Sequence, residues 1–320
     1  MIVTTSLVKT FRMCPLEAYY SLQGLRKPER PGDATNRGTY LHSWLETDSK
    51  PELPEDLMEE ELSIYAYLDD IYKAYKSRWK SESWEVLARE LKLERPLPGR
   101  KGHTYQGKVD KVVRIHDKIW IVDHKTHKKI PPFEYRQLDI QSHAYMWLIR
   151  PWVEENYLGT PIGGMIWDYI HMDSSLEYPK LTPTGKLKLV GGKPTSKDAA
   201  MTAAWMTREG SEYHKLSAED RRKVQLHLNE LSSRPSPGFS RVMVPYTPEA
   251  HMRHMKQILR WARQIVDTDW TKAPEDRNPV LCGNSFLCKY GKLAGALMDV
   301  GDDTMPRKTF EVVDPLERYK

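Results

Sequence analysis

Two carboxylates and one lysine stand near the ends of two consecutive segments that are rich in β-branched residues. Asp110 lies in the first segment, residues 105–115. Asp123 and Lys125 lie near the end of the second segment, residues 118–126. Successive side chains of a strand alternate between its two faces, so Asp123 and Lys125 point into the same space. Pairing of the two segments as a hairpin brings Asp110 beside them.

These three residues suit metal-assisted phosphate chemistry. Carboxylate oxygens are the ligands that a hard divalent cation such as Mg²⁺ or Mn²⁺ prefers. Such a metal polarises a phosphate and lowers the pKa of a bound water, and a lysine nearby stabilises the charge of a pentavalent phosphorus. We therefore predict that Asp110, Asp123 and Lys125 are catalytic. The alternative, from these residues alone, is an ion pair at a solvated strand end.

Two further sets of residues have side chains that fit such a site. Gln141 and Tyr145 are four residues apart in a predicted helix at 134–149, so they share one face of it. An amide and a phenol can contact a phosphate or a base edge, although Tyr145 is also compatible with a half-buried core position. His42 stands in a short apolar helix, one turn before Glu46. Its ring nitrogen can complete the coordination of a metal, or the ring can be an ordinary core residue.

The elements that must position these residues predict a mixed α/β sheet. Strand, strand, strand, helix and strand follow one another within about 85 residues, an order typical of this class. The predicted elements are a helix capped by Ser6 and running to about Ser21, a basic loop at 26–37, a short helix to residue 46, a helix at 54–81, strands at 86–94, 105–115 and 118–126, a helix at 134–149, a strand at 163–170, helices at 198–232 and 247–267, and a short strand at 240–244.

The composition is that of a folded chain with a mild basic excess. The 320 residues are 39 % hydrophobic and include 10 Trp and 17 Tyr, too many aromatic residues for a disordered chain. Lys and Arg number 49 against 44 Asp and Glu, a formal charge of +5 that permits a nucleic-acid partner. No apolar run reaches the roughly 18 residues of a membrane span, and the first 20 residues lack a secretory signal. Three cysteines favour a cytoplasmic protein without a disulfide framework.

The ordered set of short motifs resembles the RecB-type branch of the PD-(D/E)xK nucleases. The match is closest to phage-encoded exonucleases that are related to the CRISPR-associated RecB-like exonucleases. The residues that carry it are, in chain order, segment 6–15, Gly38 to His42 with segment 41–46, Gly107-x-x-Asp110, Asp123-x-Lys125, Gln141-x-x-x-Tyr145, segment 166–170, and the tail 277–279 with Cys282 and Cys288. The resemblance implies an α/β restriction-endonuclease-like core, a mixed central sheet flanked by helices, with helical N-terminal and irregular C-terminal elaborations.

The resemblance also implies a role for each candidate residue. Expected metal ligands are His42, Asp110, Asp123 and His124; the catalytic lysine is Lys125; and the DNA-positioning residues are Gln141 and Tyr145. Many members carry an extra acid before the Gly-x-x-Asp strand. Glu90 stands at that place here, and Glu94 competes for the role.

The cysteines depart from the pattern of these relatives. Many relatives hold a 4Fe–4S cluster with four cysteines, whereas this chain offers Cys14, Cys282 and Cys288 and has Ala294 at the expected fourth position. Three thiolates can hold a cluster with one open iron site, or zinc together with a histidine. They can equally be small buried apolar residues that bind nothing.

We expect one elaborated domain over residues 1–320. Its expected parts are an N-terminal helical part at 1–82, the nuclease core at 83–170, a loop and helical elaboration at 171–270, and a cysteine-bearing tail at 271–320. The basic run at 124–129 directly follows the catalytic segment and is expected either to contact the DNA backbone or to be a solvated face.

The resemblance implies a Mg²⁺- or Mn²⁺-dependent deoxyribonuclease, an exonuclease acting on DNA ends or single strands in phage recombination or processing. Its expected partners are DNA and, in recombination, a partner protein, while no membrane contact is expected. Alternatives are an endonuclease, a non-catalytic DNA-binding or recombination-mediator protein on the same fold, and a purely structural protein. No heptad pattern predicts an oligomer.

Overall fold

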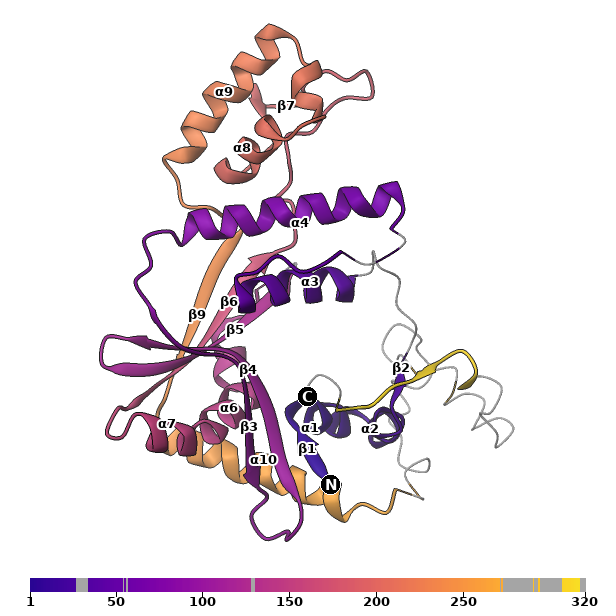
Figure 1. Ribbon diagram of the computed structural model, residues 1–320, viewed down its shortest axis with the longest axis vertical. Helices are drawn as coiled ribbons and strands as arrows, with labels where there is room; N and C mark the ends of the chain where they lie inside the picture. Colours follow the sequence, from indigo (N-terminus) through magenta and orange to yellow (C-terminus); the bar gives the residue numbers. More distant parts are fainter. Residues whose placement is uncertain are drawn as a thin grey trace.

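The computed structural model describes residues 1–26, 34–53, 55, 57–127, 130–270, 272, 290, 293 and 307–316, and these contain a mixed central sheet (Figure 1). The strand order is β1-β4-β5-β6-β9, and β3 pairs with β4. The bounds of the strands are β1 Ile2–Thr4, β3 Glu85–Pro96, β4 Thr104–Ile115, β5 Lys118–His127, β6 Ile162–His171 and β9 Phe239–Pro245.

Strand β4 has two neighbours along one edge. β3 is antiparallel to β4 from residue 104 to residue 114, and it takes up one edge of that strand. The other edge is shared: β1 pairs with residues 104–106, and β5 pairs with residues 111–115. Among the described residues, therefore, no strand lies beside 107–110 of β4 on that edge. Beyond the last β4–β5 pair, Lys111 with Val122, the two strands diverge.

The strands β5 and β6 are parallel, so a long crossover must connect them. The crossover consists of the helices α5 Phe133–Gln137, α6 Ile140–Leu148 and α7 Arg150–Asn156. The antiparallel strand β9 extends the sheet beyond β6.

Helices cover both faces of the sheet (Figure 1). The helices α1 Thr5–Met13, α6 and α10 Pro248–Asp267 pack on one face and share the largest apolar core with β5 and β6. The helices α3 Ala34–Thr47 and α4 Glu59–Arg78 lie on the other face and form a second apolar group with Ile170 of β6. Along β5, Ile121 and Asp123 thus point to the face that α6 covers. Val122, between them, points to the opposite face and belongs to a separate apolar group.

The predicted mixed α/β sheet is confirmed, and several predicted bounds are wrong. One predicted helix, from Ser6 to Ser21, is two helices, α1 and α2 Pro15–Leu22, since a proline lacks the N–H that a helix interior needs. The cap of α1 is Thr4, whose hydroxyl accepts the N–H of Leu7, rather than Ser6. The predicted helix at 134–149 is also two helices, α5 and α6. The break occurs because the side chain of Asp139 accepts the N–H of Gln141 and so caps the start of α6.

The elaboration after β6 is more ordered than the sequence indicated. The predicted loop at 171–200 contains a hairpin of β7 Leu189–Val190 and β8 Lys193–Pro194, and the predicted helix at 198–232 is interrupted. Its elements are α8 Ala199–Thr207, the 3-10 helix η1 Glu212–Lys215 and α9 Ala218–Ser232. They enclose an apolar group of their own around Trp205, beyond α4 (Figure 1).

The two ends of the chain meet. The strand β2 Leu25–Arg26 pairs with β10 Glu311–Val312, and the hydroxyl of Tyr290 donates a hydrogen bond to the Leu25 carbonyl over 2.6 Å. Tyr290 also belongs to the buried apolar group that contains Cys14. None of the helices in the described ranges is sufficiently long and apolar to cross a bilayer.

Three histidines pack together between α6 and α10. The rings of His143 and His254 are stacked with centroids 4.0 Å apart, and the His251 ring lies 5.8 Å from that of His143. Burial lowers the pKa of both His143 and His251 from 6.5 to about 4. A folded-state pKa below the unfolded one means that these histidines favour folding above about pH 6.5 and lose that contribution as the pH falls toward 4.

We predict that replacing His143 with Gln makes stability less sensitive to acid. Between pH 7 and pH 5 the wild type should lose about 2 kcal/mol more free energy of unfolding than the variant, because the variant lacks one buried imidazole to protonate. Urea unfolding at the two pH values measures the difference. His214→Gln at an exposed position of η1 should behave like the wild type. Equal acid sensitivity of His143→Gln and the wild type would contradict the prediction.

Candidate functional site

The predicted catalytic carboxylates lie at the point where β4 and β5 diverge, which we call the fork. Asp110 directly precedes Lys111, and Asp123 directly follows Val122, and these two neighbours form the last backbone pair before the strands separate. The backbone N–H of His124 donates to Oδ2 of Asp110 over 2.7 Å and so ties the two strands beyond that pair. The fork therefore places both carboxylates close together, on backbones that the sheet holds rigidly.

Helix α3 brings two side chains that could ligate a metal to the Asp110 side of the fork. His42 and Glu46 stand one turn apart, and His42 Nδ1 lies 3.9 Å from Glu46 Oε1 and 4.0 Å from Asp110 Oδ2. Ligand atoms of the three residues all lie within 4.8 Å of one another. A Cβ on Gly38 would be 3.2 Å from Thr126 Oγ1, so the glycine lets α3 approach β5.

Asp123 is held from the α6 side. Its side chain is 3 % exposed, it forms an ion pair with Lys125, and its Oδ1 accepts a hydrogen bond from Gln141 Nε2 over 2.6 Å. Asp139 in turn accepts the backbone N–H of Gln141 over 2.9 Å, which fixes the start of α6. Gln141 thereby orients one of the two carboxylate oxygens of Asp123.

Tyr145 enters the site because residue 107 is glycine. A Cβ on Gly107 would lie 2.9 Å from Tyr145 Cε1 and 2.8 Å from Leu148 Cδ1, closer than real Cβ contacts come. The tyrosine is buried in the main core, and it also lines the cavity at the fork. The glycine of the Gly-x-x-Asp motif is thus explained by the close packing of α6 on β4.

A further carboxylate reaches the same cavity from β3. Glu90 lines the cavity and pairs with Lys108, whereas Glu94 is exposed. Glu90 has φ +50°, a left-handed conformation that is uncommon for a residue with a side chain. Of the two competing acids, the structure therefore brings Glu90 to the site.

The crowding of acids shifts their pKa values. Burial, Asp110 and Glu90 raise the pKa of Glu46 to about 9. Burial opposes the ionisation of Asp110, but the His124 side chain and the positive charges nearby keep its pKa well below its usual range. The pKa of Asp123 rises to about 6, mainly through burial.

The bases of the site are shifted as well. Burial lowers the pKa of His42 to about 4, so its imidazole is neutral at pH 7 and its ring nitrogen is free to ligate. Burial opposes the charge of Lys125, yet Asp123 and Asp110 outweigh it and raise the pKa of the lysine. Lys125 therefore carries its charge at neutral pH.

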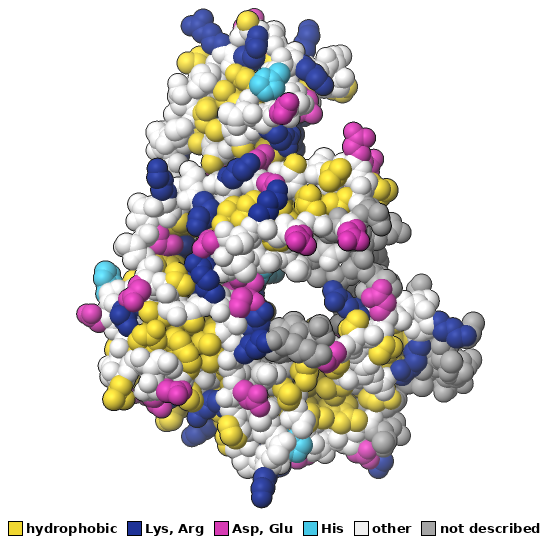
Figure 2. All heavy atoms as spheres, in the orientation of Figure 1, with side chains coloured by type: hydrophobic (Ala, Val, Ile, Leu, Met, Phe, Trp, Pro, Cys, Tyr) yellow, Lys and Arg dark blue, Asp and Glu magenta, His cyan; other side chains and the backbone are white. Residues whose placement is uncertain are grey.

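The residues at the fork fit a divalent cation. His42, Glu46 and Asp110 offer a nitrogen and two carboxylates close together, and Asp123 lines the same cavity, so the donors are of the kind that Mg²⁺ or Mn²⁺ accepts. The raised pKa of Glu46 arises in part from repulsion between carboxylates, which a bound cation relieves. The cavity between α1 and α3 has a volume of about 700 Å³. Figure 2 shows the molecule hollowed between these helices.

The ring of His124 contacts Asp110 but lines a different cavity from the other candidate residues. Its side chain is 1 % exposed, and its two ring nitrogens lie 3.5 Å from Asp110 Oδ2 and 4.0 Å from Asp168 Oδ2. Alternation along β5 turns Asp123 and Lys125 toward the fork cavity and His124 toward a different cavity. His124 thus reaches Asp110 in two ways, through its backbone N–H and through its ring nitrogen Nδ1.

The cysteine prediction is tested only at Cys14. This residue is buried, unpaired and packed with Tyr290 and Leu293. Cys282 and Cys288 lie outside the described residues, so a cluster or zinc site stays a prediction.

Sequence reasoning assigned no role to three residues that line the fork cavity. Glu46 was noted only for its spacing from His42, and that same spacing of one turn could have identified it as a ligand. Lys108 stands two residues before Asp110, so strand alternation could have placed it there. Lys9 pairs with Asp139 over 2.7 Å, a contact across 130 residues that no local pattern signals.

We predict that Asp110→Asn abolishes stabilisation by metal. Mn²⁺ should raise the melting temperature of the wild type by binding the folded state, and the variant should show little or no rise because the amide removes a charged ligand. Thermal melts at increasing Mn²⁺ concentration measure the effect. Asp117→Asn in the exposed turn between β4 and β5 should respond like the wild type. An undiminished rise in Asp110→Asn would show that the metal binds elsewhere.

A protein family and several solved structures are similar to this chain. A family profile described as the PD-(D/E)XK nuclease superfamily matches residues 3–291. A crystal structure of an Eubacterium rectale protein, named there as a candidate exonuclease, has a TM-score of 0.43 and 11 % identity, covering 94 % of both chains. The crystal structure of SSO0001 has a TM-score of 0.32 and 12 % identity over 90 % of this chain and 83 % of that one. No curated protein matches the sequence.

The family match includes every strand of the central sheet and both sides of the fork. The predicted fold class is confirmed: an α/β fold in which helices flank a mixed central sheet. Because the match covers most of the chain, this protein belongs to the PD-(D/E)XK nuclease superfamily.

Proposed function

We propose that this protein is a Mg²⁺- or Mn²⁺-dependent DNA exonuclease that hydrolyses phosphodiester bonds at DNA ends or in single strands. Membership of a nuclease superfamily implies a nucleic-acid substrate. The observation that carries the proposal is the fork, where Asp110, Asp123 and the charged Lys125 share one cavity.

Each side chain at the fork has its own proposed role. His42, Glu46, Asp110 and Asp123 hold the cation, which when bound supplies Lewis-acid polarisation of a phosphate oxygen and a water of lowered pKa. Lys125 presents its ammonium group where negative charge develops on the phosphate. Gln141 holds Asp123, and Tyr145 packs beside it at the cavity wall.

Two helices flank the fork cavity. Residues of α1, such as Thr5 and Ser6, and residues of α3, such as Gly38 and Ser43, line the cavity on two sides. We propose that a single strand enters between these two helices. We propose end processing or recombination as the task.

We predict that Asp123→Asn and Lys125→Met each slow cleavage of end-labelled linear single-stranded DNA by at least about 100-fold, because each removes a charged group at the reacting phosphate. EDTA should abolish cleavage by the wild type. The rate and product ladder on a denaturing gel measure both effects. Lys256→Met, an exposed position on α10, is the matched control and should cleave normally.

The same assay separates the alternatives. Cleavage that persists in folded Asp123→Asn would overturn the assignment of the site. Salt-sensitive DNA binding without any metal-dependent product would favour the non-catalytic or mediator protein. Cleavage of a covalently closed single-stranded circle at the linear rate would establish an endonuclease, whereas an intact circle supports the exonuclease.

A further inference from the structure

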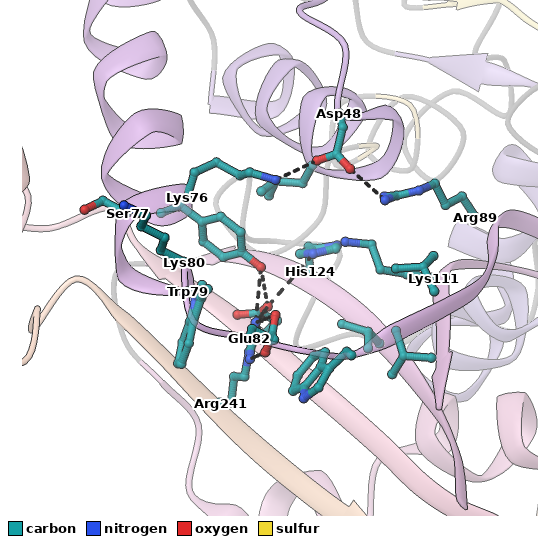
Figure 3. Close-up of a pocket in the computed structure, with 17 residues that line it drawn as sticks. Asp48, Lys76, Ser77, Trp79, Lys80, Glu82, Arg89, Lys111, His124 and Arg241 are labelled. Carbon is teal, nitrogen blue, oxygen red and sulfur yellow. Dashed lines mark hydrogen bonds and ion pairs between the residues drawn. The ribbon is translucent and has the colours of Figure 1, made fainter. Parts of the chain in front are cut away.

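A second cavity of about 560 Å³ lies on the face of β5 away from the catalytic carboxylates (Figure 3). It shares no lining residue with the fork cavity. Val122 and His124 line it, while the alternate residues Asp123 and Lys125 line the fork. The C-terminal part of α4 borders this cavity, and β3, β4 and β9 contribute side chains to it.

Cations outnumber acids in the second cavity. Lys76, Lys80, Arg89, Lys111 and Arg241 face Asp48, Glu82 and Asp168. The carboxylate of Asp48 pairs with two of these cations. Its Oδ1 lies 3.1 Å from Lys76 Nζ, and its Oδ2 lies 2.6 Å from an Arg89 nitrogen. The formal charge of the lining is therefore positive, which favours an anionic ligand.

Lys111 is a half-buried cation without an ion pair. No described residue offers it a hydrogen bond or a carboxylate within 4.0 Å, although burial and Arg89 lower its pKa. Figure 3 shows Lys76 and Arg89 reaching Asp48 from opposite sides, with Lys111 beside His124. Such a lysine is available to a phosphate that enters the cavity.

Aromatic rings connect this cavity with a third one. The guanidinium of Arg241 lies 3.7 Å from the ring centroid of Trp79 and 4.0 Å from that of Trp84. Both tryptophans also line a neighbouring cavity of about 380 Å³, together with Arg78 and Arg114. The two cavities therefore adjoin at Trp79, Glu82 and Trp84, and arginines lie over both tryptophan rings.

Phosphates pair with cations and bases pack against aromatic rings, so two adjoining cavities lined by both kinds of side chain fit one linear ligand. We propose that the two adjoining cavities bind a segment of single-stranded DNA, with phosphates at Lys111 and Lys80 and bases packed near Trp79 and Trp84. The choice of DNA over other polyanions rests on the proposed function. The bound DNA segment would lie on the opposite face of the sheet from the fork, away from the phosphodiester bond that is cleaved.

The test measures binding of a fluorescent 15-nucleotide oligothymidylate in EDTA, where the proposed metal-dependent cleavage does not occur. Lys111→Met should weaken binding about tenfold and reduce the slope of log affinity against log salt by about 1, because one phosphate contact is lost. Trp84→Leu should weaken binding by about tenfold with an unchanged salt slope. Lys80→Met gives a second lysine variant at an exposed position, and Lys256→Met on α10 is the control.

Cleavage of a saturating trinucleotide separates this proposal from the proposed function. The three variants should cleave it at the wild-type rate, since so short a strand cannot occupy both faces of the sheet. Wild-type affinity and salt slope in folded Lys111→Met and Lys80→Met would overturn the second binding site and leave the nuclease standing. Weakened binding in these variants, with no cleavage by any protein, would support the binding site and refute the nuclease.

Discussion

The divergence of β4 and β5 is the constraint on which the site depends. The two strands pair as far as Lys111 and Val122, and the carboxylates stand on the next residue of each strand. Because β1 occupies the far end of the same β4 edge, the gap between β1 and β5 is fixed by the sheet itself. Acidic side chains at a gap of this kind can approach one another without displacing a backbone hydrogen bond.

The acids repel one another, and the structure offsets that repulsion in different ways. Asp110 accepts the His124 N–H, Asp123 is held by Lys125 and Gln141, and Glu46 instead has a pKa raised to about 9. Removing any one partner leaves a buried carboxylate that favours protonation. The site is therefore arranged around a positive charge, with Lys125 on one side and room for a cation on the other.

Local patterns predicted most of the sheet and the residues at its fork. Strand alternation placed Asp123 and Lys125 on one face, and helical spacing placed Gln141 beside Tyr145. Local patterns did not predict contacts between distant segments, such as Lys9 with Asp139 or β1 with β4, because those depend on tertiary packing. The direction of the His124 ring follows from the same alternation that placed Asp123, so it was predictable in principle.

Anomalous diffraction from a crystal soaked in Mn²⁺ tests the central claim most directly. The account predicts a manganese peak in the fork cavity, bound by carboxylate oxygens of Asp110 and Asp123, with Glu46 or His42 completing the protein ligands. A crystal of Asp110→Asn soaked in the same way should lose that peak. A manganese peak away from the fork, in crystals whose fork carboxylates are accessible and ordered, would contradict the account.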